Sequence, residues 1–317
     1  MAKRGKLQNN AEYLTMRALL GALETLPRPI AVAAGQKFGA LTYRTLGNLR
    51  RTGERNLQLA FPEKSAGERE HILRASFQSL GRLLGEFSHL SRHTPESLRA
   101  AVDYDETGMS YLEEARATGR GIIFLTLHLG AWELLSFAHS AIHHPLAFMV
   151  RRLDNHLLET FVDARRTRFG NETIDKKSAV RRALKVLREG GMLGILGDLN
   201  TQPQEGVFVP FFGIPACTTA GIAMLALRTN AVIVPACAPW DERRGKYVFQ
   251  GQKMIDLERS GDNEKDVLAI TTACTGAIEN FIRAYPEQWL WVHKRWRTRP
   301  PGEPDLYDTR HRQIWKR

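Results

Sequence analysis

Short apolar runs alternate with helix-like patterns from about residue 100 onward. The runs that predict buried strands cover residues 121–127, 146–150, 192–197, 231–236 and 247–250. Between them, a helical period predicts helices over residues 157–169, 179–189, 220–228 and 264–284. Strands that alternate with helices pack as a sheet between helical layers. The pattern therefore predicts an α/β fold over residues 101–317, with a mixed, mostly parallel central sheet flanked by helices.

The first 100 residues carry amphipathic helical patterns instead. Two apolar stripes lie on either side of Pro27: Met16, Leu19, Leu20, Leu23 and Leu26 before it, then Ile30, Ala34, Phe38 and Leu41. Such helices lie in a membrane interface or pack on the core, and the sequence leaves both interpretations open. Residues 65–90 predict a further helix pair, which Ser65 and Glu68 open as a capping box. We expect residues 1–100 to form an N-terminal helical, membrane-facing region.

Positive charge is concentrated at the two ends of the chain. Of the net charge of +11, residues 1–55 contribute 10 Lys or Arg against 3 acids, and residues 290–317 contribute 8 against 3. The 234 residues between them carry a net charge of −1. Basic ends favour an anionic partner, such as an anionic membrane surface, nucleic acid or an acidic carrier protein. Solubility is the alternative explanation.

The cysteine spacing, the start of the chain and the lengths of its apolar runs argue against a cysteine-based metal or redox motif, a secretory signal and a membrane-spanning helix. The 3 cysteines, Cys217, Cys237 and Cys274, lack the close spacing of a metal or redox motif, so we expect a reducing compartment. The start of the chain lacks the apolar block of a secretory signal. The best candidate for a spanning helix, residues 221–240, is interrupted by Arg228 and Asn230. We expect a protein of the cytoplasmic side.

His128 follows the predicted strand at 121–127, at the edge where α/β sheets carry their ligands. Glu133 comes five positions later, which on a continuous helix turns it about 140° away from His128. The two side chains meet only if His128 precedes the helix, and Gly130 allows the sharp turn that this requires. In that arrangement Glu133 fixes the imidazole tautomer, while the other ring nitrogen takes a proton from an attacking hydroxyl.

The segment from His128 to Glu133 resembles the HxxxxE block of the lipid A biosynthesis lauroyl/myristoyl acyltransferases, a branch of the lysophospholipid acyltransferase group. Residues 149–155, 197–200, 206–213 and 288–296 resemble further blocks of that family in the same order. The run at 206–213, GVFVPFFG, is the most specific match. Ala131, Arg152 and Leu199 depart from the usual Asn, Pro and Gln of these blocks.

The resemblance implies a glycerol-3-phosphate acyltransferase-like fold with His128 as general base and Glu133 as its orienter. It implies an acyl thioester donor, on acyl carrier protein or coenzyme A, and a hydroxyl of a lipid A precursor as acceptor, with no metal or cofactor. It also implies peripheral or monotopic attachment to the cytoplasmic face of the inner membrane. Another glycolipid, a lysophospholipid or an ornithine lipid would use the same chemistry, and the sequence does not separate these acceptors.

Three polar residues in the later blocks are candidates for substrate binding. The guanidinium of Arg151 suits an acceptor phosphate or the thioester carbonyl, although pairing with Asp154 is the alternative. Asn155 belongs to the same block. Asp198 follows the predicted strand at 192–197, where it holds Arg151 or the acceptor, or caps the next turn.

Two aromatic segments suggest contact with lipid. Phe211 and Phe212 lie in a glycine-bounded apolar loop that is expected to line an acyl-chain pocket or touch lipid, with core packing as the alternative. Trp289, Trp291 and Trp296 stand among basic residues, which suits a membrane interface or nucleic acid.

Two other classes compete with acyl transfer. A non-catalytic basic binding protein would explain the charged ends but gives His128 no role, and the sequence contains no nucleic-acid module. A hydrolase would replace the acceptor hydroxyl with water. The sequence contains no GxSxG, HExxH, Walker A or GxGxxG pattern, so the motifs of the common hydrolases and nucleotide-binding proteins are absent from it. Acyl transfer is the function we expect.

Overall fold

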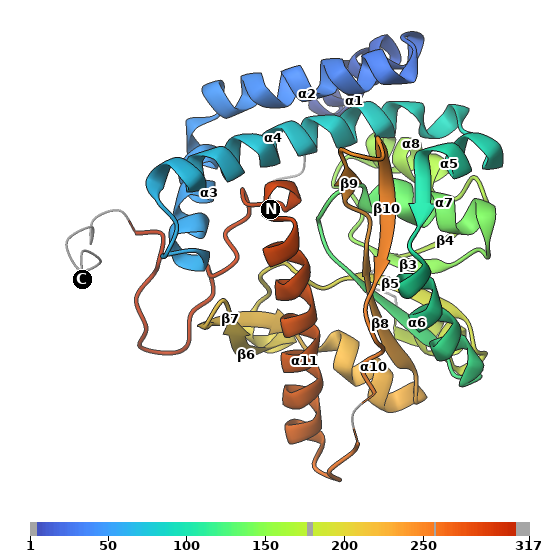
Figure 1. The fold of residues 1–317 in the computed structure, drawn as a ribbon, viewed down its shortest axis with the longest axis vertical. Coiled ribbons are helices and arrows are strands. Elements are labelled where there is room, and N and C mark those ends of the chain that lie inside the picture. The colour runs from blue at the N-terminus through green and yellow to red at the C-terminus, as the bar shows by residue number, and fades with distance from the viewer. Residues whose placement is uncertain (1–4, 176–179, 257, 309–317) are drawn as a thin grey trace.

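A computed structural model describes residues 5–175, 180–256 and 258–308, and Figure 1 shows a layer of helices lying across an α/β core. The helices of the described residues are α1 (Lys6–Thr25), α2 (Arg28–Thr45), α3 (Gly47–Ala60), α4 (Ala66–His89), α5 (Pro95–Ala101), α6 (Glu106–Ala117), α7 (Trp132–Ile142), α8 (His156–Arg166), α9 (Val180–Arg188), α10 (Gly221–Thr229) and α11 (Asn263–Ala284). Short 3-10 turns are η1 (Leu90–Arg92), η2 (Pro203–Glu205) and η3 (Pro286–Gln288).

The strands form one large sheet and one small one. They are β1 (Val102–Tyr104), β2 (Ile122–Thr126), β3 (Ala147–Val150), β4 (Glu172–Asp175), β5 (Met192–Leu196), β6 (Gly206–Phe211), β7 (Ile214–Thr219), β8 (Val232–Cys237), β9 (Trp240–Asp241) and β10 (Lys246–Gly251). The large sheet has the order β1-β10-β8-β2-β5-β3-β4, with β9 paired to β10, and β6 pairs with β7 separately. Only the pairs of β10 with β8 and β9 are antiparallel in the large sheet. The mixed, mostly parallel sheet is confirmed.

Each long strand and helix predicted from the pattern after residue 100 is present, with no boundary shifted by more than three residues. Residues 65–90 form one long helix, α4, followed by η1, so the predicted helix pair is wrong. The capping box is present, because Ser65 accepts from the Glu68 amide and Glu68 accepts from the Ser65 amide. Residue 179 and the basic residues within 309–317 lie outside the described residues. The division of the chain at residue 100 stays a prediction.

The outer helix α2 packs very closely on α4. A Cβ atom on Gly35 would lie 2.2 Å from the carbonyl oxygen of Gly81, and one on Gly81 would lie 2.1 Å from that of Gly35. Only glycine allows the two backbones to approach so far. Because α2 turns its small residues toward α4, its bulky side chains Ile30, Phe38 and Leu41 face outward and are about half exposed. Core packing is therefore wrong for this second stripe, but it is the outcome for Leu20 and Leu23 of the first stripe, which are buried.

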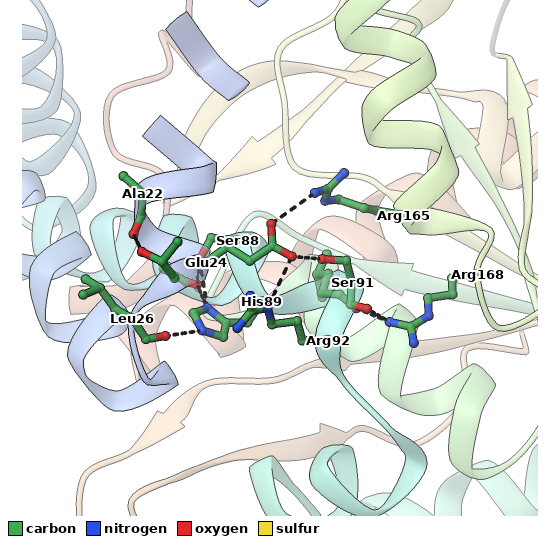
Figure 2. Close-up of polar contacts among 12 residues, drawn as sticks. Ala22, Glu24, Leu26, Ser88, His89, Ser91, Arg92, Arg165 and Arg168 are labelled. Atoms are coloured by element: carbon green, nitrogen blue, oxygen red, sulfur yellow. Dashed lines mark hydrogen bonds and ion pairs between the residues drawn. The ribbon is translucent and has the colours of Figure 1, made fainter. Parts of the chain in front are cut away.

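Helix α1 is fastened to the core by polar contacts at its C-terminal end (Figure 2). Glu24 accepts a hydrogen bond from Ser91 at 2.5 Å and lies 3.6 Å from Arg92 and 3.9 Å from Arg165 of α8. The His89 ring contacts the carbonyl oxygen of Leu26 at 3.0 Å. The N-terminal helices are therefore held against the rest of the fold. Among the described residues, no helix has the length and apolar content needed to cross a membrane.

Candidate active site

His128 lies in a short loop between the buried strand β2 and helix α7. Gly130 has φ +60°, and a Cβ atom there would lie 2.1 Å from the carbonyl oxygen of Ala238. The chain reverses at this glycine and α7 begins at Trp132, so the turn expected between His128 and the helix is confirmed. Hydrogen bonds from Gly130 to Gln288 and from Ala131 to Ala238 fix the loop.

The hydrogen-bond partner of His128 is Asp198. Nδ1 of His128 lies 2.8 Å from Oδ1 of Asp198, and the backbone amide of His128 donates to Oδ2 at 2.9 Å. Oδ2 also accepts from the indole Nε1 of Trp289 at 2.8 Å. Asp198 is fully buried, so these donors replace water around its carboxylate. The arrangement holds the imidazole ring in one orientation.

The register of the sheet brings these two residues together. Strands β2 and β5 run parallel with Thr126 opposite Leu196. His128 and Asp198 each come two residues further along, at the same edge of the sheet. Asp198 bonds to His128 and Trp289, which corrects the two expectations that it holds Arg151 or caps the next turn. It is fully buried and does not line the cavity, so its expected contact with the acceptor is not seen either.

Charge fixes the protonation of this pair. Burial by itself raises the pKa of Asp198, but His128 and the hydrogen bonds from His128 and Trp289 hold the pKa below its ordinary value. The carboxylate is therefore ionised and accepts the Nδ1 proton, which leaves Nε2 of His128 as the basic nitrogen. Burial by itself lowers the pKa of His128, but Asp198 and then Glu133 raise it above its ordinary value of 6.5.

Glu133 is bonded to Arg166 rather than to His128, which corrects the expectation that it orients the imidazole. The Nε atom of Arg166 donates to Oε2 of Glu133 at 3.0 Å, and Nη2 of Arg166 donates to Oε1. Asp198, which follows the neighbouring strand β5, occupies the Nδ1 side of the ring instead. Glu133 acts on His128 only through its charge, since no hydrogen bond joins them among the described residues. Arg166 carried no signal in the sequence beyond its place in a predicted helix.

A cavity of about 700 Å³ opens beside His128. Its charged and polar lining includes His128, Glu133, Arg151, Arg166, Asn200 and His293. Its remaining wall is mostly apolar and includes Phe124, Leu135, Leu146, Phe148 and Leu225. Thr126 and His139 also line it, with a hydroxyl and two ring nitrogens that have no hydrogen-bond partner among the described residues. The volume and lining suit an apolar ligand with one polar end.

Asn155 does not face this cavity, which corrects its place among the substrate-binding candidates. Its side chain is buried and caps α8 by accepting from the amides of Leu157 and Leu158. Its Nδ2 donates to the carbonyl oxygen of Asn9 at 2.8 Å and to Glu12 at 3.1 Å. Asn155 therefore joins α1 to α8. Arg151, by contrast, lies at the end of β3, exposed at the cavity.

The aromatic segments are core rather than surface. Phe211 is fully buried against Trp289 and Trp296, and Phe212 is buried against Phe61 and Trp291. Neither phenylalanine lines the cavity, so the expected acyl-pocket or lipid contact is wrong and core packing is the outcome. Trp289, Trp291 and Trp296 are also fully buried, which excludes both the membrane-interface and the nucleic-acid contact considered for them.

The described part of the chain contains no candidate metal site and no reactive thiol. No group of three or more His, Cys, Asp or Glu is arranged to hold a metal ion there. The three cysteines are free and buried. Burial raises the pKa of Cys274 to about 12, that of Cys237 well above its ordinary value and that of Cys217 as well, so none of the three is a thiolate nucleophile. The His128 and Asp198 pair is the candidate catalytic centre.

Sequence comparison identifies the family. A profile described as bacterial lipid A biosynthesis acyltransferase matches residues 5–298. The lipid A biosynthesis lauroyltransferase of Escherichia coli (strain K12) is 31% identical over 89% of this chain and 90% of its own length. A lipid A biosynthesis acyltransferase of Haemophilus influenzae is 30% identical over 92% of both chains, and the E. coli myristoyltransferase is 26% identical over 93% of this chain and 89% of its own length. The chain therefore belongs to the bacterial lipid A biosynthesis acyltransferase family.

Proposed function

We propose that this acyltransferase moves a fatty acyl group from an acyl thioester to a hydroxyl of a lipid A precursor, with His128 as general base. The observation that supports this most directly is the buried Asp198 carboxylate on Nδ1 of His128, beside an apolar cavity of about 700 Å³. A base with a fixed tautomer next to room for an acyl chain is what direct transfer to a hydroxyl requires.

The reaction needs no covalent intermediate on the protein. Nε2 of His128 removes the proton from the acceptor hydroxyl as the oxygen attacks the thioester carbonyl carbon. The tetrahedral intermediate then collapses, the carbon–sulfur bond breaks, and the proton on His128 passes to the departing sulfur. The ionised Asp198 stabilises the imidazolium that exists between the two proton transfers. The ester and the free thiol are the products.

The polar rim of the cavity suits the charged parts of the substrates. Arg151 is exposed at the cavity with its fork of donors, which fits a phosphate of the acceptor or the thioester carbonyl. Arg166 is held in place by Glu133 at the same rim. The apolar wall takes the acyl chain. We propose acyl carrier protein as the donor, with acyl-coenzyme A as the alternative. Both donors are anionic, so either would be attracted to this basic chain.

Transfer of a radiolabelled acyl group tests this function. Acyl carrier protein and coenzyme A thioesters would each be offered with a tetra-acylated lipid A precursor, a lysophospholipid and an ornithine lipid. We expect labelled lipid A product, with the carrier protein as the better donor. Product only with another lipid would keep the His128 chemistry and replace the acceptor, and release of free fatty acid alone would indicate a hydrolase.

We also propose that α1 and α2 attach the protein to the cytoplasmic face of the inner membrane. Leu14 is 64% exposed, Phe38 45% and Leu41 53%, all on these two outer helices (Figure 1). Lys37 and Arg44, also on α2, are exposed as well. Exposed apolar side chains beside basic ones suit the boundary between anionic headgroups and acyl chains.

Replacing Leu14 and Phe38 with glutamine should weaken binding to anionic phospholipid vesicles by at least tenfold. Each inserted side chain contributes about 1.5–3 kcal/mol when it leaves water, and about 1.4 kcal/mol is tenfold in affinity. Vesicle co-sedimentation measures the change. The matched control is Leu268→Gln, which alters a 46% exposed leucine on α11, away from the outer helices. Equal binding by all three proteins would move the attachment to another surface.

A further inference from the structure

His293 lines the same cavity as His128, and its backbone is held in place by several hydrogen bonds. The side-chain Nδ2 of Asn56 donates to the carbonyl oxygens of His293 and Trp291, each at 2.6 Å. The Asn56 side chain is itself fully buried and accepts from the hydroxyl of Tyr307 at 2.5 Å. The backbone of Leu290, three residues earlier, donates to the carbonyl oxygen of His128 at 3.1 Å. The segment that carries His293 is therefore tied to the loop that carries His128.

The position of the proton on the His293 ring follows from one hydrogen bond. The backbone amide of Asn200 lies 3.1 Å from Nε2 of His293. A backbone N–H can only donate, so Nε2 must be the unprotonated nitrogen that accepts. The neutral ring then carries its proton on Nδ1. Among the described residues, Nδ1 has no hydrogen-bond partner, and it is not buried.

The ring is neutral when the reaction takes place. Burial lowers the pKa of His293, and although Asp198 raises it, the positive charges of Arg295, His128 and Arg297 lower it further. The proton that His128 takes up during catalysis therefore disfavours a second positive charge on His293. His293 stays a neutral donor with a single N–H while its neighbour becomes an imidazolium.

We propose that His293 donates its Nδ1–H to the carbonyl oxygen of the acyl thioester and stabilises the oxyanion that forms during transfer. This proposal rests on the proposed function. When the acceptor oxygen attacks, the carbonyl electron pair moves to that oxygen, and the N–H bonds to the resulting negative charge. When the carbon–sulfur bond breaks, the electron pair returns and the oxyanion disappears. A donor fixed in advance at such a site lowers the barrier because it does not have to reorient during the reaction.

Two substitutions separate this role from a structural one. His293→Asn can present its amide N–H where Nδ1 stood, but it cannot reach the Asn200 amide. His293→Gln can present its amide oxygen to the Asn200 amide, where Nε2 stood, but it loses the donor at the Nδ1 position. We expect the glutamine variant to lose about 10²–10³ in kcat with little change in KM for the thioester, as for a lost oxyanion donor. The asparagine variant should stay within about tenfold of wild type in kcat.

The opposite order, with glutamine active and asparagine inactive, would assign His293 to holding Asn200 and overturn the proposal. Equal kcat values in the two variants, high or low, would also overturn it. If the glutamine variant does not fold by circular dichroism, the asparagine variant decides alone, because it must keep its activity without the Asn200 contact. If the wild-type protein transfers no acyl group, the proposed function is wrong. If His293→Gln turns over at the normal rate, only the proposal for His293 is wrong.

Discussion

Replacing His128 with glutamine lowers the rate of acyl transfer by about 10²–10⁴, the usual contribution of a general base. Glutamine keeps the approximate size of the side chain and places its amide where Nε2 stood, and the backbone amide of residue 128 can still donate to Asp198, but a side-chain amide cannot take a proton from the acceptor hydroxyl. The attacking oxygen must then lose its proton to water. Initial rates with a labelled acyl thioester and the acceptor that wild type uses measure the change.

His71→Gln is the matched control for this substitution, because His71 is exposed on α4 and lines no part of the cavity. Its rate should equal that of wild type. Thermal unfolding of both variants shows whether the fold is retained. A folded His128→Gln protein with unchanged turnover would take His128 out of the mechanism and leave the cavity without a base.

Much of the fold follows from local sequence patterns. The strands near 122–126, 192–196 and 232–237 were predictable because each is an apolar run in the middle of the sheet, buried on both faces. The pattern gave no sign of β1 or β9, at the edge of the sheet, since these have 3 and 2 residues. Two or three residues are too few to show the alternation of apolar and polar positions that marks a strand.

The candidate site was predictable only in part. His128 and Asp198 each follow a buried strand, so both were candidates from the sequence. Their pairing depends on β2 lying next to β5, although β3 and β4 come between these strands in the chain. Local patterns do not give that order, so the sequence favours Glu133, which is near His128 in the chain, over Asp198, which is near it in space.

Burial of polar and aromatic groups was the other source of error. Asn155 and Phe211 both belong to blocks that resemble the family, and both were expected at the substrate. The structure buries Asn155 as a helix cap bonded to α1 and Phe211 against two tryptophans. A polar or aromatic residue in such a block can support the site without lining it, and only the packing separates the two roles.

Replacing Asp198 with asparagine lowers turnover by about 10³–10⁴, as expected when a histidine base loses the carboxylate that sets its tautomer. The oxygen of the new amide can still accept from Trp289, while the amide N–H faces Nδ1 of His128. Nδ1 must then accept that hydrogen bond, so the proton moves to Nε2 and the basic nitrogen no longer faces the acceptor. Initial rates across a pH series measure both the loss and its pH dependence.

The same substitution should also move the pH dependence of kcat/KM in a defined direction. Only neutral His128 accepts a proton, and its pKa lies above 6.5 in the wild type, so wild-type kcat/KM should rise with pH through a limb above 6.5. Without the charge of Asp198, burial dominates and the pKa of His128 falls, so the limb moves to lower pH while the plateau drops. Asp256→Asn, which alters a surface pair with Arg120, is the control and should change neither. A limb that does not move in a folded Asp198→Asn protein would leave Asp198 with a purely structural role.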